Sequence, residues 1–235
     1  MFFSDFFVIG VGGTGGHLAA PLARLVAYHP NTQGAKVTFI DGDSFESSNL
    51  TRQIVGESQI NMNKARAMKD FCSYQGLTDV ECKDQFITAS TFIPMIRNSE
   101  RPVIICSVDN DATRKAIIDA INNTRQGKDF FYITPGNSDG LEEVRGQTLW
   151  WGRIDNVNVG MNPTIAYPNI DQPQDSIPHS GSCALNAPSR PQLISANFLC
   201  ASITLAVIQN LLDETLDPTQ SSMFFNLRTM KTSVS

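Results

Sequence analysis

The sequence predicts an α/β protein with a doubly wound, Rossmann-like and mainly parallel sheet. Short β-branched or apolar runs alternate with segments of helical spacing over residues 1–136, and the first run ends in a glycine-rich turn that opens a helix. At about 150 residues per domain, 235 residues predict one domain spanning 1–235. We expect 1–136 to form its α/β core and 137–235 to add C-terminal strands, a crossover loop and a long buried helix.

The core elements follow one another in regular alternation. The runs that predict strands cover 6–10, 36–41, 78–83, 103–108 and 130–134, and the segments that predict helices cover 17–28, 61–74, 88–98 and 112–123. The run 103–108 is continuously apolar, as expected for a parallel strand buried on both faces. Pro21 lies within the first helical segment, so we expect a kink or a late helix start there.

The chain after residue 136 has a different texture. Residues 144–151 predict a strand, while 154–191 are rich in Asn and Pro with little periodicity, which indicates a long functional or irregular loop. Residues 192–212 are apolar almost all round, so they predict a buried helix, and the polar Asn197 and Gln209 argue against a membrane span. A last strand is expected over 222–227.

Composition excludes several classes of protein. Apolar residues at 41% and charged residues at 17% exclude an intrinsically disordered chain. The net charge is -5, without basic clusters, which argues against nucleic-acid binding. The apolar start lacks a basic leader, so it does not resemble a signal peptide. Five cysteines without a Cys-x-x-Cys pair predict no disulfide framework, no zinc site and a reducing, cytoplasmic location.

The glycine-rich turn is the first candidate site. Gly10, Gly12, Gly13 and Gly15 follow the first strand, where backbone amides and a helix N-terminus can approach phosphate oxygens. This pattern predicts a nucleotide site without separating a dinucleotide from ATP, and its alternative is a turn needed only for packing. Asp41, at the end of the second strand, is placed to accept hydrogen bonds from ribose hydroxyls. Its alternative is a capping or turn role.

Cationic residues in the next segment favour a triphosphate. Arg52 offers a planar fork of donors and Lys64 a compact charge, both suited to charge that develops on departing pyrophosphate. Asp109 follows the buried strand 103–108 at the same edge of the sheet, where one carboxylate and the substrate phosphates could hold Mg²⁺. As an alternative, Asp109 caps the following helix, a role that Asn110 or Asp111 could equally fill.

Together these motifs resemble the E1-like, ThiF/MoeB/HesA family of ATP-dependent activating enzymes. The resemblance rests on the Gly-x-Gly-Gly-x-Gly turn, the segment from Asp41 to Gln53 with its Ser-Asn-Leu-x-Arg-Gln end, Lys64, and Ser107-Val108-Asp109-Asn110. It covers about residues 6–136. Leu-Ala-Arg-Leu at 22–25 and the segment 59–65 are similar to ThiF-type proteins of bacterial mobile-element gene clusters.

The resemblance implies an adenylyltransferase for the C-terminal glycine carboxylate of a ubiquitin-like or sulfur-carrier β-grasp protein, using ATP and Mg²⁺. It also implies a homodimer. The residues it implies for ATP are the turn glycines, Asp41 on the ribose, Ser48, Asn49, Arg52 and Lys64, with Asp109 and Asn110 for metal and nucleotide.

Many members of the family then transfer the acyl group to a cysteine on a crossover loop. Cys183 lies at the matching position ahead of the long helix, so it is the candidate acceptor for a thioester or persulfide, and its alternative is an incidental loop thiol. The sequence departs from the family in lacking both zinc-binding Cys-x-x-Cys pairs. It also starts almost at its first strand, without an N-terminal helix that could present an arginine to a partner subunit.

Two other functions remain open from the sequence. An NAD(P)- or FAD-dependent oxidoreductase would explain the glycine turn and Asp41 but leaves Arg52, Lys64 and Asp109 without a purpose. A nucleotide-binding scaffold that has lost turnover would explain the absence of an arginine supplied in trans.

Overall fold

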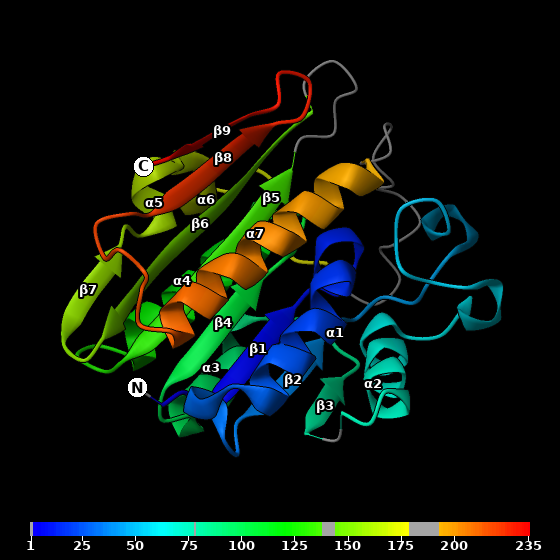
Figure 1. Ribbon diagram of the computed structural model, residues 1–235, viewed down its shortest axis with the longest axis horizontal. Helices are drawn as coiled ribbons and strands as arrows, with labels where there is room; N and C mark the ends of the chain where they lie inside the picture. The colour runs from blue at the N-terminus through cyan, green and yellow to red at the C-terminus, as the bar shows by residue number, and fades with distance from the viewer. Residues whose placement is uncertain (1, 78, 138–143, 179–192) are drawn as a thin grey trace.

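The computed structural model describes residues 2–77, 79–137, 144–178 and 193–235. Its strands form one nine-stranded sheet in the order β3-β2-β1-β4-β5-β6-β8-β9, with β7 paired to β6 (Figure 1). They are β1 (Asp5–Ile9), β2 (Lys36–Ile40), β3 (Val80–Lys83), β4 (Pro102–Cys106), β5 (Phe130–Asn137), β6 (Arg145–Ile154), β7 (Val157–Gly160), β8 (Ser222–Asn226) and β9 (Lys231–Val234). The first five pair in parallel and the rest antiparallel. The predicted Rossmann-like fold is confirmed.

Helices cover both faces of the sheet, as a doubly wound fold requires. They are α1 (Gly13–Tyr28), α2 (Lys64–Tyr74), α3 (Ala89–Asn98), α4 (Asp111–Thr124), α5 (Pro163–Ala166), α6 (Pro168–Asp171) and α7 (Ile194–Leu212), with 3-10 turns η1 (Pro30–Thr32), η2 (Ser47–Asn49) and η3 (Glu57–Gln59). α1, α2 and α7 lie in front of the sheet in Figure 1, and α3 and α4 lie behind it. Each layer has its own apolar cluster against the sheet.

α1 differs from its prediction at its start. The helix begins at Gly13 and runs through Pro21, so of the two expectations, a kink or a late start, the late start is wrong. Proline removes only one amide donor, and the buried face that includes Leu18 and Leu22 packs into the core and holds the helix together across it. The early start brings the N-terminus of α1 directly to the end of the glycine turn.

The segment predicted as irregular, 154–191, contains regular elements in its described part. β7 extends the β6 edge, and α5 and α6 form two short turns, each with proline at its start. β9 had no sequence signal because all four of its residues are exposed and show no alternation of polar and apolar side chains. Elements of four residues depend on neighbouring chain for their hydrogen bonds, which periodicity does not reveal.

α7 is a core helix on one side only. Its inner face, including Ala201 and Ile208, packs against α1, β5 and β6, as predicted for a buried helix. Its outer face leaves Ile194 and Phe198 about half exposed, so the expectation of burial all round is wrong. The helix is long and apolar enough to cross a membrane by length and composition, but half of its apolar window is buried inside the protein.

The central strands place the site. β1 lies between β2 and β4, with Ile9 opposite both Ile40 and Cys106. The Gly10 amide donates to the Ile40 carbonyl at 2.9 Å, and the Ser107 amide donates to the Ile9 carbonyl at 2.8 Å. The chain segments that leave β1, β2 and β4 therefore meet at one edge of the sheet. Open α/β sheets bind ligands at this edge, where successive crossovers lead to opposite faces.

Candidate functional site

The glycine turn joins β1 to α1, and its glycines have different roles. Gly10 has φ +83°, and a Cβ there would lie 2.9 Å from the Ser107 carbonyl oxygen. A Cβ on Gly15 would lie 2.0 Å from the Gly10 carbonyl oxygen. A Cβ on Gly12 would meet nothing closer than the Gln53 amide nitrogen at 3.8 Å. Gly10 and Gly15 are thus required by protein contacts, whereas Gly12 has only an ordinary contact with the Gln53 side chain and is the least crowded of the three.

α1 begins directly after that uncrowded position. Gly12 is its N-cap residue and has no side chain to satisfy the first amides of the helix. Unpaired amides and the helix dipole favour an anion at this end. A Cβ on Gly13 would lie 2.4 Å from the side-chain nitrogen of Asn197, so glycine is needed at this position because α7 passes close to the turn. The packing interpretation of the turn therefore holds for Gly10, Gly13 and Gly15, and ligand binding at Gly12 stays a prediction.

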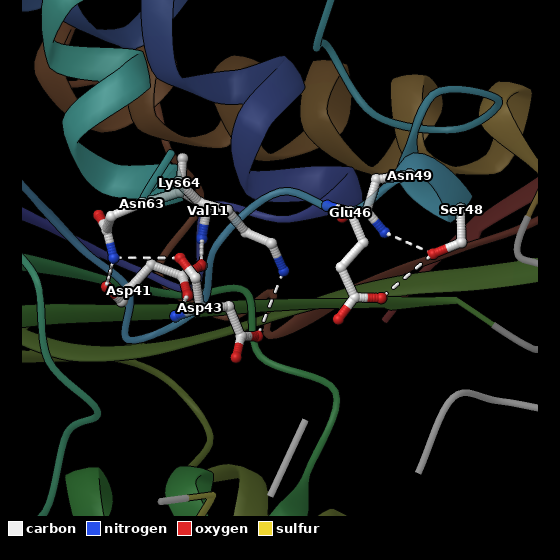
Figure 2. A network of polar contacts seen from close by, with 8 residues as sticks. All are labelled: Val11, Asp41, Asp43, Glu46, Ser48, Asn49, Asn63 and Lys64. Atoms are coloured by element: carbon white, nitrogen blue, oxygen red, sulfur yellow. Dashed lines mark hydrogen bonds and ion pairs between the residues drawn. The ribbon is translucent and has the colours of Figure 1, made fainter. Parts of the chain in front are cut away.

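Asp41 ties the turn to the end of β2. Its carboxylate accepts the Val11 amide at 2.6 Å and the Asp43 amide at 2.9 Å (Figure 2). Burial raises the pKa of Asp41, and nearby Lys64 and the two amides partly offset that effect. Each carboxylate oxygen can accept more than one hydrogen bond, so ribose contact remains compatible with this role. Asp41 therefore contributes to holding the turn in place even without a ligand.

Lys64 lies close to the turn at the start of α2. Its ammonium group is mostly buried and contacts the Asp43 carboxylate at 3.2 Å, while its backbone amide donates to the Asp43 carbonyl. Asn63 caps α2 and donates its side-chain amide to the carbonyls of Asp41 and Asp43. Figure 2 shows these side chains converging beside Val11. Asp43 thus positions Lys64 twice, through the ion pair with its side chain and through the hydrogen bond to its backbone amide.

The segment between Asp43 and Lys64 carries the remaining predicted ATP residues. Asn49 is buried, and its side-chain oxygen accepts the Glu46 amide at 3.1 Å to cap η2. Ser48 is exposed and donates to the Glu46 carboxylate at 3.4 Å. Arg52 is half-buried, and its carbonyl is within 3.4 Å of the Asn197 amide nitrogen. Asn49 therefore shapes this segment, whereas Ser48 is accessible to a ligand.

Asp109 and Asn110 follow β4 at the same edge. Asn110 caps α4 by accepting the Thr113 amide at 2.8 Å, so the alternative that Asp109 is the cap is wrong. Asp109 is exposed. Across the described ranges no group of three His, Cys, Asp or Glu side chains could hold a metal ion. Mg²⁺ at Asp109 would therefore need phosphate oxygens or water as its other ligands, which is how Mg²⁺ is commonly bound.

A cavity of about 840 Å³ lies next to the start of α4. Its floor is the face of the antiparallel strands that carries Gln147, Leu149 and Phe224, and Arg114 forms part of the wall. Arg114 donates to the Val108 carbonyl and pairs with Asp111 at 2.8 Å. The cavity thus extends from the antiparallel extension to the start of α4, where Arg114 links its wall to the loop ahead of Asp109.

Three polar residues around the turn were not predicted as site residues from the sequence. Gln53 lies over Gly12, and within the described part of the chain its side-chain oxygen has no hydrogen-bond partner. The Ser107 hydroxyl is likewise buried and unpaired beside Gly15. Such atoms are expected where a polar ligand completes the site. Asn197 contacts the turn from α7, and its only signal was a polar residue in an apolar helix. Cys183 lies outside the described residues.

Known structures share this architecture. The chain resembles PaaA with a TM-score of 0.66 and 18% identity, over 99% of this chain and 63% of that one. It resembles E. coli MccB bound to ATP with a TM-score of 0.64 and 16% identity, over 99% and 63%. MccB, a Microcin C7 biosynthetic enzyme, in complex with N-formylated MccA gives 0.63 and 14%, over 99% and 64%. The chain therefore spans about 63% of the length of the first two. At these identities the likeness shows the fold.

Sequence comparison assigns the family. No curated protein matches the chain. Residues 1–151 match the ThiF family, and this stretch contains the glycine turn, Asp41, Lys64 and Asp109. Because that match covers more than half of the chain, the protein belongs to the ThiF family.

Proposed function

We propose that the protein is an ATP-dependent adenylyltransferase that activates the C-terminal carboxylate of a polypeptide. The carboxylate oxygen would attack the α-phosphorus of ATP. The bond between that phosphorus and the oxygen that bridges it to the β-phosphorus would break, and pyrophosphate would leave. The product would be an acyl adenylate. The observation that carries the proposal is the uncrowded backbone of Gly12 beside Gln53, whose buried side-chain oxygen lacks a partner among the described residues, at the edge shared with Lys64 and Asp109. The donors and acceptors there fit a nucleotide triphosphate.

The proposed catalysis depends on position and charge. The α1 N-terminus and Lys64 would bind phosphate oxygens, and Asp41 would accept a ribose hydroxyl. Mg²⁺ held by Asp109 would neutralise phosphate charge. No side-chain base is needed, because a carboxylate is already ionised at neutral pH.

The cavity beside α4 is the proposed place for the polypeptide tail. Its mixed floor of Gln147, Leu149 and Phe224 suits an extended peptide, and its Arg114 wall adjoins the Asp109 loop where the carboxylate must arrive. We propose a ubiquitin-like or sulfur-carrier β-grasp protein as the substrate. We also propose that the enzyme acts as a homodimer. MccB in complex with MccA supports a small polypeptide as the other substrate to test.

Nucleotide binding is the first experiment. Isothermal titration should show binding of ATP with Mg²⁺ and no binding of NADH. Lys64→Ala and Asp109→Ala should each lower the affinity for ATP at least tenfold. The control variants Lys36→Ala and Asp119→Ala should leave it unchanged, because these side chains lie in surface ion pairs of β2 and α4. Binding of NADH in place of ATP would support the oxidoreductase and end the proposal.

Turnover is the second experiment. Exchange of labelled pyrophosphate into ATP should require Mg²⁺ and a candidate β-grasp protein with an intact terminal glycine. Cys183→Ala should retain exchange, because adenylation precedes any transfer to a thiol. ATP binding without exchange for every β-grasp protein or short peptide tested would favour a non-catalytic scaffold.

A further inference from the structure

Asn197 is a fully buried side-chain amide in α7, a helix that is mostly apolar and has no charged residue. It lies in the first turns of α7, and its exposed fraction is 0%. An amide moved from water to a protein interior costs free energy unless it forms hydrogen bonds. A leucine would fill this place in the apolar face without that cost. The contacts that Asn197 makes therefore have to account for its presence.

Those contacts connect three segments at the edge where the proposed ATP site lies. The Asn197 side-chain oxygen accepts a hydrogen bond from the side-chain amide nitrogen of Asn137 at 2.7 Å, which ties it to the end of β5. It also accepts the Thr14 hydroxyl at 3.4 Å, at the start of α1. The Asn197 nitrogen donates to the Arg52 carbonyl at 3.4 Å. Sequence separations of 60, 183 and 145 residues make Asn197 a long-range junction.

Packing brings the same amide against the glycine turn. The side-chain nitrogen lies 2.4 Å from the place where a Cβ of Gly13 would be, so only glycine at 13 admits it without rearrangement. The 2.7 Å bond to Asn137 holds the amide firmly, and the two contacts of 3.4 Å are long and individually weak. The bond to Asn137 thus holds the amide between the Arg52 backbone and the first turn of α1, where it contacts both.

We infer that Asn197 is a positioning residue of the nucleotide site. It fixes the Arg52 segment relative to the amides of the glycine turn, so that the Arg52 guanidinium and the α1 N-terminus act on the same phosphate groups. This inference rests on the proposed function. Loss of the amide would leave the fold in place but misplace Arg52, and displacements of about 1 Å at such sites can cost about a hundredfold in rate.

The test compares Asn197→Leu with Thr204→Val. Thr204 is also fully buried on α7, but its hydroxyl donates only within the helix, to the Cys200 carbonyl at 2.8 Å. Both variants remove a buried polar group from the same helix. For each, ATP affinity is measured by titration well below the melting temperature, and KM for ATP and kcat by pyrophosphate exchange. We expect Asn197→Leu to raise the KM for ATP at least tenfold, and Thr204→Val to leave it within twofold.

Each outcome decides the inference. Equal ATP affinity in wild type and Asn197→Leu would overturn it, as would an equal loss in Thr204→Val, which would indicate a general effect of helix packing. If Asn197→Leu does not fold, Asn137→Ala decides: it removes the 2.7 Å bond from a half-buried position, and unchanged ATP affinity would overturn the inference. A wild-type protein that binds no ATP would end the proposed function and this inference with it. If the wild type binds ATP and the Asn197 and Asn137 variants bind it equally well, the inference ends but the proposed function stands.

Discussion

Asp41 should be essential for the stability of the turn even without a ligand. Asp41→Ala removes the acceptor of two backbone amides, those of Val11 and Asp43. Val11 is fully buried, so water cannot easily replace the lost acceptor there. An unsatisfied buried donor costs about 1–3 kcal/mol, and water can replace the acceptor at the half-buried Asp43, so the Val11 amide predicts a loss of about 1–3 kcal/mol. In a chain of this size that corresponds to a fall in melting temperature of about 2–12 °C.

The assay measures thermal and urea unfolding in the absence of nucleotide, with circular dichroism as the signal. Asp119→Ala serves as the control, because it removes a carboxylate from a surface pair with Lys115 and should cost about 0.3–0.5 kcal/mol. A melting temperature of Asp41→Ala within 1 °C of wild type would refute the idea that the carboxylate holds the turn.

The pH dependence of the same residue gives an independent check. Burial raises the pKa of Asp41 above its ordinary value of 3.8, so the folded protein binds this proton more tightly than the unfolded chain does. Its contribution to the free energy of unfolding is then fully present below about 3.8 and is lost as the pH rises through the higher folded pKa. Asp41→Asn cannot titrate, so wild type should lose stability relative to this variant as the pH rises. A difference that grows in favour of wild type would indicate a lowered pKa.

Three further outcomes follow from packing. Gly15→Ala places a methyl group 2.0 Å from the Gly10 carbonyl oxygen and should lower the free energy of unfolding by about 1–3 kcal/mol or more; an unchanged urea midpoint would contradict this close approach. Burial raises the pKa of Cys200 to about 12 and that of Cys72 to about 11, so iodoacetamide at pH 8 should label neither in the folded protein by mass spectrometry, and rapid labelling of Cys200 would show that it is accessible. Arg125→Met leaves several buried carbonyls without donors and should cost about 2–5 kcal/mol with unaltered ATP affinity, and a loss of affinity at equal stability would place Arg125 in the site instead.

The parallel core could be predicted because each strand has a local signature. The run 103–108 is continuously apolar since both faces of β4 are buried, and the glycines after β1 mark the turn to α1. The extension was harder to predict. β9 is fully exposed, and its pairing with β8 satisfies its backbone without any apolar alternation.

Two of the predicted site residues could be brought together from the sequence because they follow strand ends. Asp41 comes directly after β2, Asp109 follows β4 after Ser107 and Val108, and parallel topology alone brings these ends together. Asn197 could not be found in this way, because its role depends on α7 crossing the glycine turn about 180 residues after that turn in the chain. Likewise, the difference between the uncrowded Gly12 and the tightly packed Gly15 depends on distances that a sequence pattern does not contain.

β5 has a further consequence for local unfolding. Among the described strands it alone has a parallel neighbour, β4, on one side and an antiparallel neighbour, β6, on the other, and α7 packs across it. Opening β5 would disrupt both halves of the sheet, so its amides should exchange with solvent only through global unfolding. β9 has one neighbour and four exposed residues, so it should exchange first. Protection from hydrogen exchange should thus decline from β5 outward, and the extension should loosen before the edge that carries the glycine turn.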